Sequence, residues 1–416
     1  MSETSTVSAA TDLRIRVIAH LADATPAAWD RCAGSVDTAC NLQLSHDAAT
    51  VDALKTEYNP FVSHAFLSAL ERSQSATGRT GWAPQHLLVE AADGELLGAA
   101  PCYLKSHSRG EYVFDGGWAD AYERAGGAYY PKLQVSVPFT PATGPRLLVR
   151  PGPLGDSVRQ TLAAAFVALC ERRQASSVHL TFLPKPDCEF LAARGFLKRT
   201  DQQFHWRNDG YSSFDDFLAA LSSRKRKVIR RERRDAAESG ITVHHLTGSD
   251  LTEAVWDDFF TFYRETGSRK WGQPYLTRAF YSMIGQSMPD KILLVMAKRA
   301  GRYIAGAINF ICSQTLFGRH WGAIEHHPFL HFELCYYQAI EFAIAHKLAT
   351  VEAGAQGEHK LTRGYVPVTT YSSHYIADPG LRRAIADYLK RERAYVDAAG
   401  RELEALTPFR KTEAGE

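Results

Sequence analysis

The sequence is short of the features that mark secreted, membrane-spanning and metal-clustering proteins. It has seven cysteines in 416 residues and no C-x-x-C pair, so neither a zinc knuckle nor a disulfide framework is expected. Its longest apolar runs, Leu162–Cys170 and Tyr303–Cys312, are about half as long as a bilayer-spanning helix. Met1–Thr11 has neither a basic start nor an apolar stretch, so we expect a frayed tail and no secretory signal there.

The sequence also has little net charge. Its 48 basic and 46 acidic residues leave a formal charge of +2, so any attraction to nucleic acid or membrane must be local. The length of 416 residues exceeds one ordinary core, because domains usually hold about 100 to 200 residues. These features together predict a soluble, cytoplasmic protein of two or three domains, whose oligomeric state the sequence leaves open.

What the sequence does contain is an internal repeat with a period near two hundred residues. His86–Leu104 in the first half and Lys291–Ile311 in the second are both apolar, β-branched runs. Each run is interrupted by a glycine, Gly94 or Gly301, where a turn would lie. Two apolar runs joined across such a turn predict a β-hairpin in each half.

The repeat continues beyond the hairpins. Apolar residues at helical spacing predict helices over Asp156–Arg173 and His331–His346, and each is followed by a predicted strand, Ser177–Phe182 or Ala349–Ala353. Each copy ends with a further predicted strand, and both of these strands contain aromatic residues and a histidine. The same order of elements, found twice, indicates a duplicated α/β unit.

We therefore predict an α/β (α+β) fold of two tandem lobes with mixed central sheets flanked by helices. The first lobe would span residues 12–208 and the second residues 241–378. Residues 209–240 would form a basic interlobe helix. Residues 379–416 would form a long C-terminal helix and tail, and the apolar residues of this helix recur at helical spacing, which predicts that it packs across the lobes.

Four stretches resemble a FemAB-like family associated with peptidoglycan biosynthesis or recognition. They are Asn59–Glu71, Gly110–Tyr122, Tyr129–Leu147 and, above all, His331–Tyr365. The order of elements is also similar to the GNAT (N-acetyltransferase) fold, so the resemblance implies two tandem GNAT-like lobes. It covers nearly the whole chain after the tail.

The resemblance implies an N- or O-acyltransferase, or an aminoacyltransferase, that acts on a polar acceptor such as a peptidoglycan precursor. The donor would be acyl-CoA or aminoacyl-tRNA, which makes tRNA a candidate partner, and no cofactor would be bound permanently. The second lobe lacks the long coiled-coil arm of better-known FemAB enzymes, which favours acyl-CoA, whereas its poor phosphate loop favours aminoacyl-tRNA. The alternative is a non-catalytic binder of cell-wall precursor or anionic head groups on the same duplicated fold.

The densest group of reactive side chains lies at Glu352–Tyr365, directly after a predicted strand. Ligands of α/β proteins gather at the carboxyl ends of strands, and the small residues of this segment leave room for a substrate. A run of solvated loop charges is the alternative. We expect Glu352 and His359 to be catalytic, and the following side chains to bind substrate: Gln356, Glu358, Lys360, Arg363 and Tyr365.

Glu333 is a second candidate for the catalytic base. Its predicted helix is apolar on almost every face, so this carboxylate should be buried. A buried carboxylate must find a partner or take up a proton, and the second behaviour suits a general base. The alternative is a first-turn glutamate satisfied by free N–H groups and the helix dipole. Glu333 and Glu352 therefore compete for the role of base.

A phosphate-bearing donor needs a loop that offers N–H groups ahead of a helix. The Pro/Gly loop Val137–Leu147 offers Thr140, Gly144 and Arg146 for this purpose. Its counterpart in the second lobe, Ile324–Leu330, contains no glycine. The alternative is that Val137–Leu147 is an ordinary connecting loop that binds no phosphate.

The basic segment Ser222–Arg234 holds eight lysines and arginines. Like charges at this density repel one another, so we expect an anion to visit the segment, with Arg226 and Arg230 among its ligands. The resemblance implies that the anion is a pyrophosphate-linked precursor or a nucleic-acid donor. A solvated interlobe helix is the alternative.

An aromatic stretch with interspersed charges, Tyr112–Tyr130, is a candidate lining for a cleft between the lobes. Aromatic faces suit sugars or bases, so we include Trp118, Asp115 and Lys132 among the substrate-binding candidates. A place in the core is the alternative, and it is the one we expect for Phe114.

Three histidines, His326, His327 and His331, lie close together. Pro328 prevents one continuous helix through them. His327 and His331 are four residues apart, but no third metal ligand stands at a fixed spacing from this pair. We therefore predict no metal site.

Overall fold

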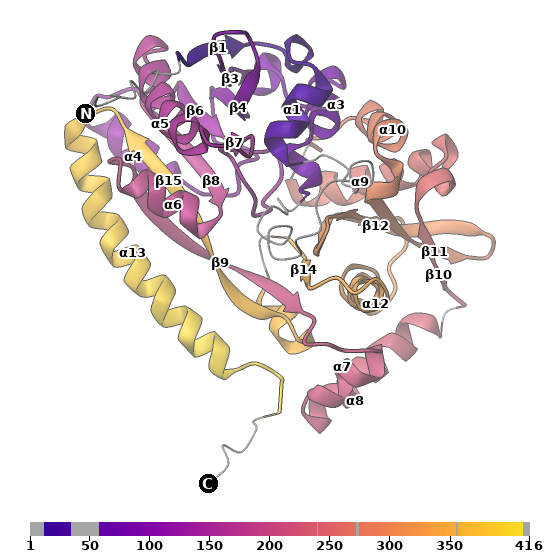
Figure 1. The fold of residues 1–416 in the computed structure, drawn as a ribbon. Helices are drawn as coiled ribbons and strands as arrows, with labels where there is room; N and C mark the ends of the chain where they lie inside the picture. The colour runs from indigo at the N-terminus through magenta and orange to yellow at the C-terminus, as the bar shows by residue number, and fades with distance from the viewer. Residues whose placement is uncertain (1–11, 35–57, 239, 272–273, 355–356, 411–416) are drawn as a thin grey trace, which may run out of the picture.

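The computed structural model describes residues 12–34, 58–238, 240–271, 274–354 and 357–410. Its strands form a four-stranded sheet, β1-β3-β4-β7, and an eleven-stranded sheet, β10-β11-β12-β13-β14-β9-β15-β8-β6-β5-β2 (Figure 1). Helices flank both sheets, and among the described residues no helix combines the length and the apolar character that crossing a membrane requires.

The first half of the chain holds β1 (Arg14–Ile18), η1 (Leu21–Asp23), α1 (Pro26–Ala33), η3 (Pro60–Val62), α3 (His64–Arg72), η4 (Gly78–Thr80), β2 (Trp82–Pro84), β3 (His86–Glu90), β4 (Leu96–Ala100), β5 (Cys102–Lys105), α4 (Gly116–Arg124), β6 (Lys132–Val135), β7 (Leu148–Val149), α5 (Gly155–Arg172), β8 (Ser177–Leu183), α6 (Lys185–Ala192) and β9 (Leu197–Arg207). Two helices follow it, α7 (Phe214–Ala220) and α8 (Ser223–Ala237).

The second half holds β10 (Thr242–Leu246), η5 (Gly248–Asp250), α9 (Glu253–Trp271), α10 (Arg278–Ser287), η6 (Pro289–Lys291), β11 (Ile292–Arg299), β12 (Arg302–Ile311), β13 (Thr315–Ala323), α11 (Leu330–Phe332), η7 (Glu333–Tyr337), α12 (Gln338–Ala345), β14 (Thr350–Glu352), η8 (Glu358–Arg363), β15 (Val366–Ile376) and α13 (Pro379–Ala405). The segment η7 is a single π-helical turn between α11 and α12.

Both predicted hairpins are confirmed. Strands β3 and β4 pair antiparallel, and so do β11 and β12. The turn of each hairpin contains a glycine with positive φ, 88° at Gly94 and 82° at Gly301. In each half the hairpin is followed by a parallel pair, β6 with β8 and β13 with β14, so the predicted duplication is confirmed as well.

The two lobes exchange their last strands. Strand β9 of the first half pairs with β14 of the second, while β15 of the second half pairs with β8 of the first. The exchanged strands β9 and β15 also pair with each other, with Asp201 opposite Thr370. The large sheet is therefore continuous through both lobes, a result that the repeat alone did not predict.

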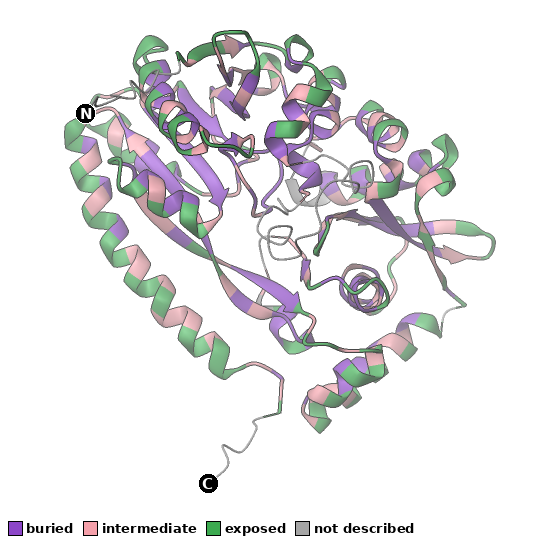
Figure 2. Cartoon of the chain, in the orientation of Figure 1, coloured by how far each residue is buried: buried purple, intermediate pink, exposed green. Residues whose placement is uncertain are grey.

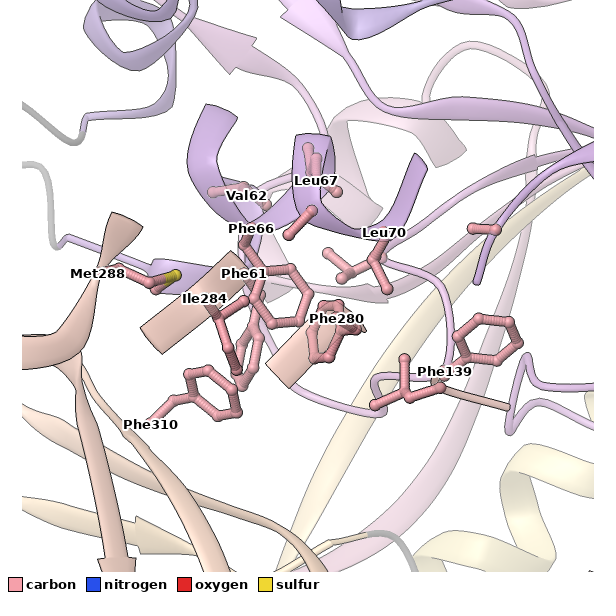
Figure 3. Close-up of a cluster of buried hydrophobic side chains, with 14 of the residues drawn as sticks. Phe61, Val62, Phe66, Leu67, Leu70, Phe139, Phe280, Ile284, Met288 and Phe310 are labelled. Atoms are coloured by element: carbon pink, nitrogen blue, oxygen red, sulfur yellow. The ribbon is translucent and has the colours of Figure 1, made fainter. Parts of the chain in front are cut away.

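A shared apolar core also joins the lobes (Figure 3). Phe61 and Phe66 from the first half meet Phe310 and Phe280 from the second, with ring centroids 5.0 Å apart for Phe61–Phe310 and 5.5 Å for Phe66–Phe280. All four rings are buried. Because each buried phenylalanine stabilises the fold by about 1.5 to 3 kcal/mol, the lobes are held together as parts of one core.

The predicted C-terminal helix is confirmed as α13, which begins where Asp378 accepts a 2.7 Å hydrogen bond from the Leu381 N–H. Its apolar stripe, Leu381, Ile385 and Leu389, is buried. The helix runs along β9 and β15, and its other faces are exposed (Figures 1 and 2). It therefore covers the two exchanged strands, and the predicted α/β fold of two tandem lobes with mixed sheets and a long C-terminal helix is confirmed.

The interlobe segment differs from the single helix that we predicted. The chain leaves α7 at Leu221, which pairs with Phe409, and begins α8 two residues later. The Ser222 N–H also donates to the Pro408 carbonyl at 2.9 Å. The break between the two helices thus anchors the segment that follows α13, at Pro408 and Phe409.

Candidate functional site

A cavity of about 700 Å³ lies between the two lobes. The first lobe lines it with the segment around His107–Phe114, and the second lobe lines it with parts of α9, β12, β13 and the π turn η7. A cavity of this size matches the range found for small-molecule sites, roughly 300 to 1,000 Å³.

The cavity opens where two parallel strands part. Strand β13 pairs with β14 over only three residues, Thr315–Phe317. Beyond this point β13 continues to Ala323 with β12 as its neighbour, so its other edge at Gly318–Trp321 faces the cavity. A free strand edge offers backbone N–H and C=O groups to a ligand.

A β-bulge directs Arg319 into this opening. Asn309 on β12 faces Gly318, while the preceding Ile308 faces His320, so Arg319 is the extra residue of the bulge. Bulges of this kind change the direction of a side chain. The Arg319 guanidinium donates to the Phe139 carbonyl of the first lobe. Burial lowers its pKa and the nearby Tyr112 opposes that shift, but a guanidinium remains a cation at neutral pH.

Close packing of α9 on β13 closes the cavity on one side. A Cβ atom on Gly322 would lie 2.0 Å from the Phe262 carbonyl oxygen, so only glycine permits this approach. The contact holds the following tyrosine, Tyr263, against the cavity, and its hydroxyl accepts a hydrogen bond from the Leu276 N–H at 3.3 Å.

The lining is cationic and aromatic. It includes Arg109 and Arg319 but no aspartate or glutamate from the part of the chain that the structure describes. Two histidines of the lining add little charge, since burial lowers the pKa of His107 and holds that of His320 well below its ordinary value. The cavity is therefore suited to a polar ligand with an anionic group.

Two of the predicted substrate-binding residues, Asp115 and Lys132, are buried behind the first-lobe wall. The Lys132 ammonium is bonded to Asp115 and lies 2.7 Å from a Glu111 oxygen. Burial would raise the pKa of Asp115, but Lys132 overcomes this and brings it well below its ordinary value. The cluster holds the segment that lines the cavity, because Lys105 beside it donates to the Arg109 carbonyl at 3.3 Å.

The aromatic residues of this segment take places opposite to those expected. Trp118, a substrate-binding candidate, is only 7% exposed and packs in a cluster with α13. Phe114, which we expected in the core, is 70% exposed and lines the cavity. The prediction for Phe114 was therefore wrong: the aromatic pattern does not reveal that the chain turns outward just before α4.

Glu333 is buried, as predicted, and it has partners. Its carboxylate accepts hydrogen bonds from Arg233 of α8 at 2.9 Å and from Gln338 at 2.7 Å. It lies in the π turn but does not line the cavity.

Glu352 ends β14 at the point where the strands part, next to the cavity-lining Ala353. Its carboxylate lies 3.8 Å from the imidazole of His205. Burial, aided by Lys360 and Arg207, lowers the pKa of His205 to about 3, so this histidine is neutral. Of the two predicted bases, Glu352 is the one adjacent in sequence to the cavity wall.

The segment after Glu352 is largely occupied with its own contacts. Lys360 is buried, which lowers its pKa to about 8, and donates to the Gly354 carbonyl at 2.9 Å. Arg363 forms two hydrogen bonds with Glu232 of α8, at 2.7 and 3.2 Å. Tyr365 is fully buried. Among the described residues of this segment none after Ala353 lines the cavity.

His359 has a different place. It is exposed, and its Nε2 atom lies 2.8 Å from the hydroxyl of Tyr336, which does line the cavity. Two further candidates, Gln356 and the side chain of Glu358, lie outside what the structure describes.

The predicted phosphate loop of the first lobe is folded on itself. The Arg146 guanidinium is buried and donates to the carbonyls of Ala142 and Gly144, at 2.8 and 3.0 Å. The Thr140 hydroxyl donates to the Pro138 carbonyl at 3.0 Å. These donors are therefore engaged within the loop.

The basic helix α8 has two different halves. In its C-terminal half Arg230 pairs with Asp215 at 3.0 Å. Arg233 pairs with Glu333, and it also pairs with Glu341 at 2.7 Å. In its N-terminal half, Arg224–Lys227, no ion pair occurs with any described residue; Arg226 belongs to this half and is half-buried. Acidic groups of the protein itself thus relieve much of the repulsion for which we had invoked a visiting anion.

Sequence reasoning missed several residues that line the cavity, among them Asn309, Arg319, His320 and Tyr336. Asn309 carried a usable signal, since it is the single polar residue in the apolar run Tyr303–Cys312. Arg319 and His320 are adjacent polar residues inside an otherwise largely apolar strand, which is a second signal. Tyr336 had none, because its helix is rich in aromatic residues throughout.

Fold and cavity together define a two-lobed α/β protein with a ligand-sized site between its lobes. Residues 24–411 match the family profile of FemAB-like proteins, described as peptidoglycan biosynthesis/recognition. The chain belongs to this family, as its sequence motifs predicted. Among curated protein sequences, none matches the chain at a significant level.

Several solved structures are similar to the chain. A crystal structure of FemX shares 13% identity and covers 76% of this chain and 93% of its own, with a TM-score of 0.49. L-PGS from Bacillus licheniformis shares 11% identity, with coverages of 82% and 97% and a TM-score of 0.48. A tandem GNAT protein from the clavulanic acid biosynthesis pathway shares 14% identity, with coverages of 88% and 99% and a TM-score of 0.44.

Proposed function

We propose that the protein is an acyl or aminoacyl transferase and that its reaction takes place in the cavity between the lobes. The observation that carries this proposal is the opening between β13 and β14, where a free strand edge, the half-buried cation of Arg319 and a cavity of about 700 Å³ coincide. Membership of the FemAB-like family supports it.

The opening has the groups that acyl transfer needs. The transferred carbonyl becomes anionic in the transition state, and preorganised N–H donors stabilise it best where water is excluded. Backbone groups of Gly318–Trp321 lie along this wall. The Arg319 guanidinium adds a fixed positive charge.

The same lining favours a polar acceptor that carries an anionic group, and a cytoplasmic peptidoglycan precursor fits this description. Arg109 and Arg319 would attract its carboxylate or phosphate, and the tyrosines of the wall would pack against its sugar. No carboxylate of the described lining opposes such a ligand.

For the donor we propose a phosphate-bearing molecule, acyl-CoA or aminoacyl-tRNA. The first-lobe loop is occupied by its own contacts, whereas Arg224–Lys227 at the start of α8 present cations without an internal partner among the described residues. These cations, Arg226 among them, would bind the donor's phosphates.

A thermal-shift series separates these ligands. Acetyl-CoA, a charged tRNA and a nucleotide-linked muropeptide are added separately to the purified full chain, and acyl transfer is then assayed with each pair that binds. A ligand at 100 times its Kd stabilises the folded state by about 2.7 kcal/mol, so binding is readily seen. The proposal expects stabilisation by one donor and one acceptor, followed by turnover; if no donor binds and nothing turns over, it is wrong.

A non-catalytic binder is the second candidate function. The observation that favours it is that both predicted bases lie outside the described cavity lining, with Glu333 held by Arg233. This alternative expects that the muropeptide stabilises the protein and that no transfer follows with either donor.

A further inference from the structure

Tyr336 and His359 form a hydrogen-bonded pair in the cavity wall. Tyr336 lines the cavity and is only 4% exposed, and its hydroxyl lies 2.8 Å from Nε2 of His359. His359 itself is exposed to solvent. The pair is therefore a continuous polar connection from the cavity to the outside of the protein.

The π turn η7 places this tyrosine. Single π turns within helices are rare and are often found at functional sites, because the extra residue changes which side chains face a given direction. Here the turn Glu333–Tyr337 brings both Cys335 and Tyr336 to the cavity. Two contacts with α8 hold it: Glu333 pairs with Arg233, and the Tyr337 hydroxyl donates to Glu232.

A glycine allows the histidine to meet the tyrosine. Gly357 has φ of +118°, which disfavours other residues, and a Cβ there would lie 2.4 Å from Cε1 of His359. The backbone of His359 is fixed as well, because its carbonyl accepts a 2.7 Å hydrogen bond from Arg363. Arg363 is in turn paired with Glu232.

The surroundings suit transfer of a proton rather than storage of a charge. Burial raises the pKa of Tyr336; Cys335 adds to this and Arg363 opposes it. The phenol therefore stays neutral and can only pass a proton on. The ring of His331 lies 5.5 Å from that of Tyr336 and 6.4 Å from that of His359, and the ring of Tyr365 lies 5.5 Å from that of Tyr336. Cys335 and the Arg363 guanidinium also face the pair.

We propose that Tyr336 is the catalytic residue that takes the proton of the acceptor, with His359 as the positioning residue that receives the proton of Tyr336. The proposal rests on the transferase function above. The acceptor's nitrogen or oxygen forms a bond to the acyl carbon, and the thioester C–S or ester C–O bond of the donor breaks. The acceptor's proton moves to the Tyr336 oxygen while the hydroxyl proton moves to Nε2 of His359. Afterwards His359 gives its proton to solvent, and the leaving sulfur or oxygen takes one from water.

The test compares Tyr336→Phe and His359→Gln with the parent protein, in transfer from the donor that binds to hydroxylamine as a simple acceptor. Tyr281→Phe is the control, because this tyrosine is buried in the same lobe and does not line the 700 Å³ cavity. General acid–base groups contribute roughly 100- to 10,000-fold. We expect Tyr336→Phe and His359→Gln each to lower kcat at least about 100-fold, with donor affinity unchanged, and Tyr281→Phe to be near the parent.

Two further readouts separate a relay from mere support of the wall. Groups that act as one unit are not additive, so the double variant should be no slower than the slower single variant. The pH profile of kcat should also differ between the parent and His359→Gln, because only the parent has the imidazole that receives the proton.

The outcomes are distinct. Parent turnover that survives Tyr336→Phe within about threefold overturns the relay alone, and so do additive losses in the double variant. Absence of donor binding and turnover in the parent overturns the transferase function and the relay with it. A loss of kcat in both single variants, non-additive in the double, supports the relay.

Discussion

The two lobes have the same parallel strand pair but use the place where it ends in opposite ways. In the first lobe the chain after β6 folds back onto β8, where the Gly144 N–H donates to the Phe182 carbonyl at 3.0 Å. Arg146 then fills the interior and is 1% exposed. In the second lobe β13 runs on past β14, and the cavity occupies the opening.

The contrast shows how a duplicated unit can divide its tasks. An arginine lies near the parting strands in both lobes. Arg146 donates from both terminal nitrogens of its guanidinium to carbonyls of its own loop, so its charge stabilises structure. Arg319 has one carbonyl partner from the other lobe and faces a cavity, so its remaining donors are available to a ligand or to Tyr112. One copy is therefore filled by its own loop, and the other holds the cavity.

The largest effect is expected from Arg319→Met. Under the proposed function this change removes the cation that faces the bound ligand, and we expect kcat/KM to fall about 1,000-fold, or about 4 kcal/mol of transition-state stabilisation. Thermal stability should fall less than in the matched Arg146 variant, because the Arg319 guanidinium is half-buried and bonds one described carbonyl. Steady-state kinetics and a melting curve on the same preparation check both parts. Activity within tenfold of the parent would contradict the division of tasks between the lobes.

Arg146→Met is the matched change in the first lobe, and its effect should fall on stability. The substitution leaves the carbonyls of Ala142 and Gly144 buried without their donor, at roughly 1 to 3 kcal/mol for each unsatisfied group. We expect the free energy of unfolding to drop by about 3 to 4 kcal/mol in urea denaturation. Ligand-induced stabilisation should persist at a temperature where the variant is folded. A variant as stable as the parent would show that the filled opening does not support the fold.

The pH dependence of stability should reveal Lys360 beside the open site. Burial lowers its pKa from 10.5 to about 8, so between these pH values the unfolded chain binds more protons than the folded one. The free energy of unfolding therefore rises with pH in this window, by about 3 kcal/mol for this group. Subtracting the curve of Lys360→Met from that of the parent isolates the contribution. A flat difference between pH 8 and 10.5 would show that this lysine is solvated.

Local patterns made much of the fold predictable. The hairpins at Gly94 and Gly301, the helix after Asp378 and the order of elements in each copy depend on residues near one another in the chain. The exchange of β9 and β15 was not predictable in this way, because each strand pairs with partners of the other lobe. Periodicity records which face of a strand is buried, but it does not record which sheet the strand joins.

The site was less predictable for a similar reason. Glu333 was correctly expected to be buried, yet its partner Arg233 lies 100 residues away. Arg319 reaches the cavity through a bulge whose register depends on the neighbouring strand. The dense polar segment Glu352–Tyr365 drew attention by composition, whereas the described contacts show Lys360 and Arg363 bonded within the protein.

The smallest effect is expected on the salt dependence of donor binding, and it separates the two halves of α8. Replacing Lys225, Arg226 and Lys227 with Gln removes cations that have no internal partner among the described residues. For a single-stranded nucleic-acid segment each lost phosphate contact reduces the slope of log Kd against log salt by about 0.7, so three contacts reduce it by about 2.

Replacing Arg230, Arg233 and Arg234 instead is the matched control, since these cations already pair with carboxylates of the protein. We expect the control to alter stability more than the slope. Equal slopes in the parent and in the first triple variant would mean that α8 only supports the π turn, and the donor's phosphates would then have to bind within the cavity itself.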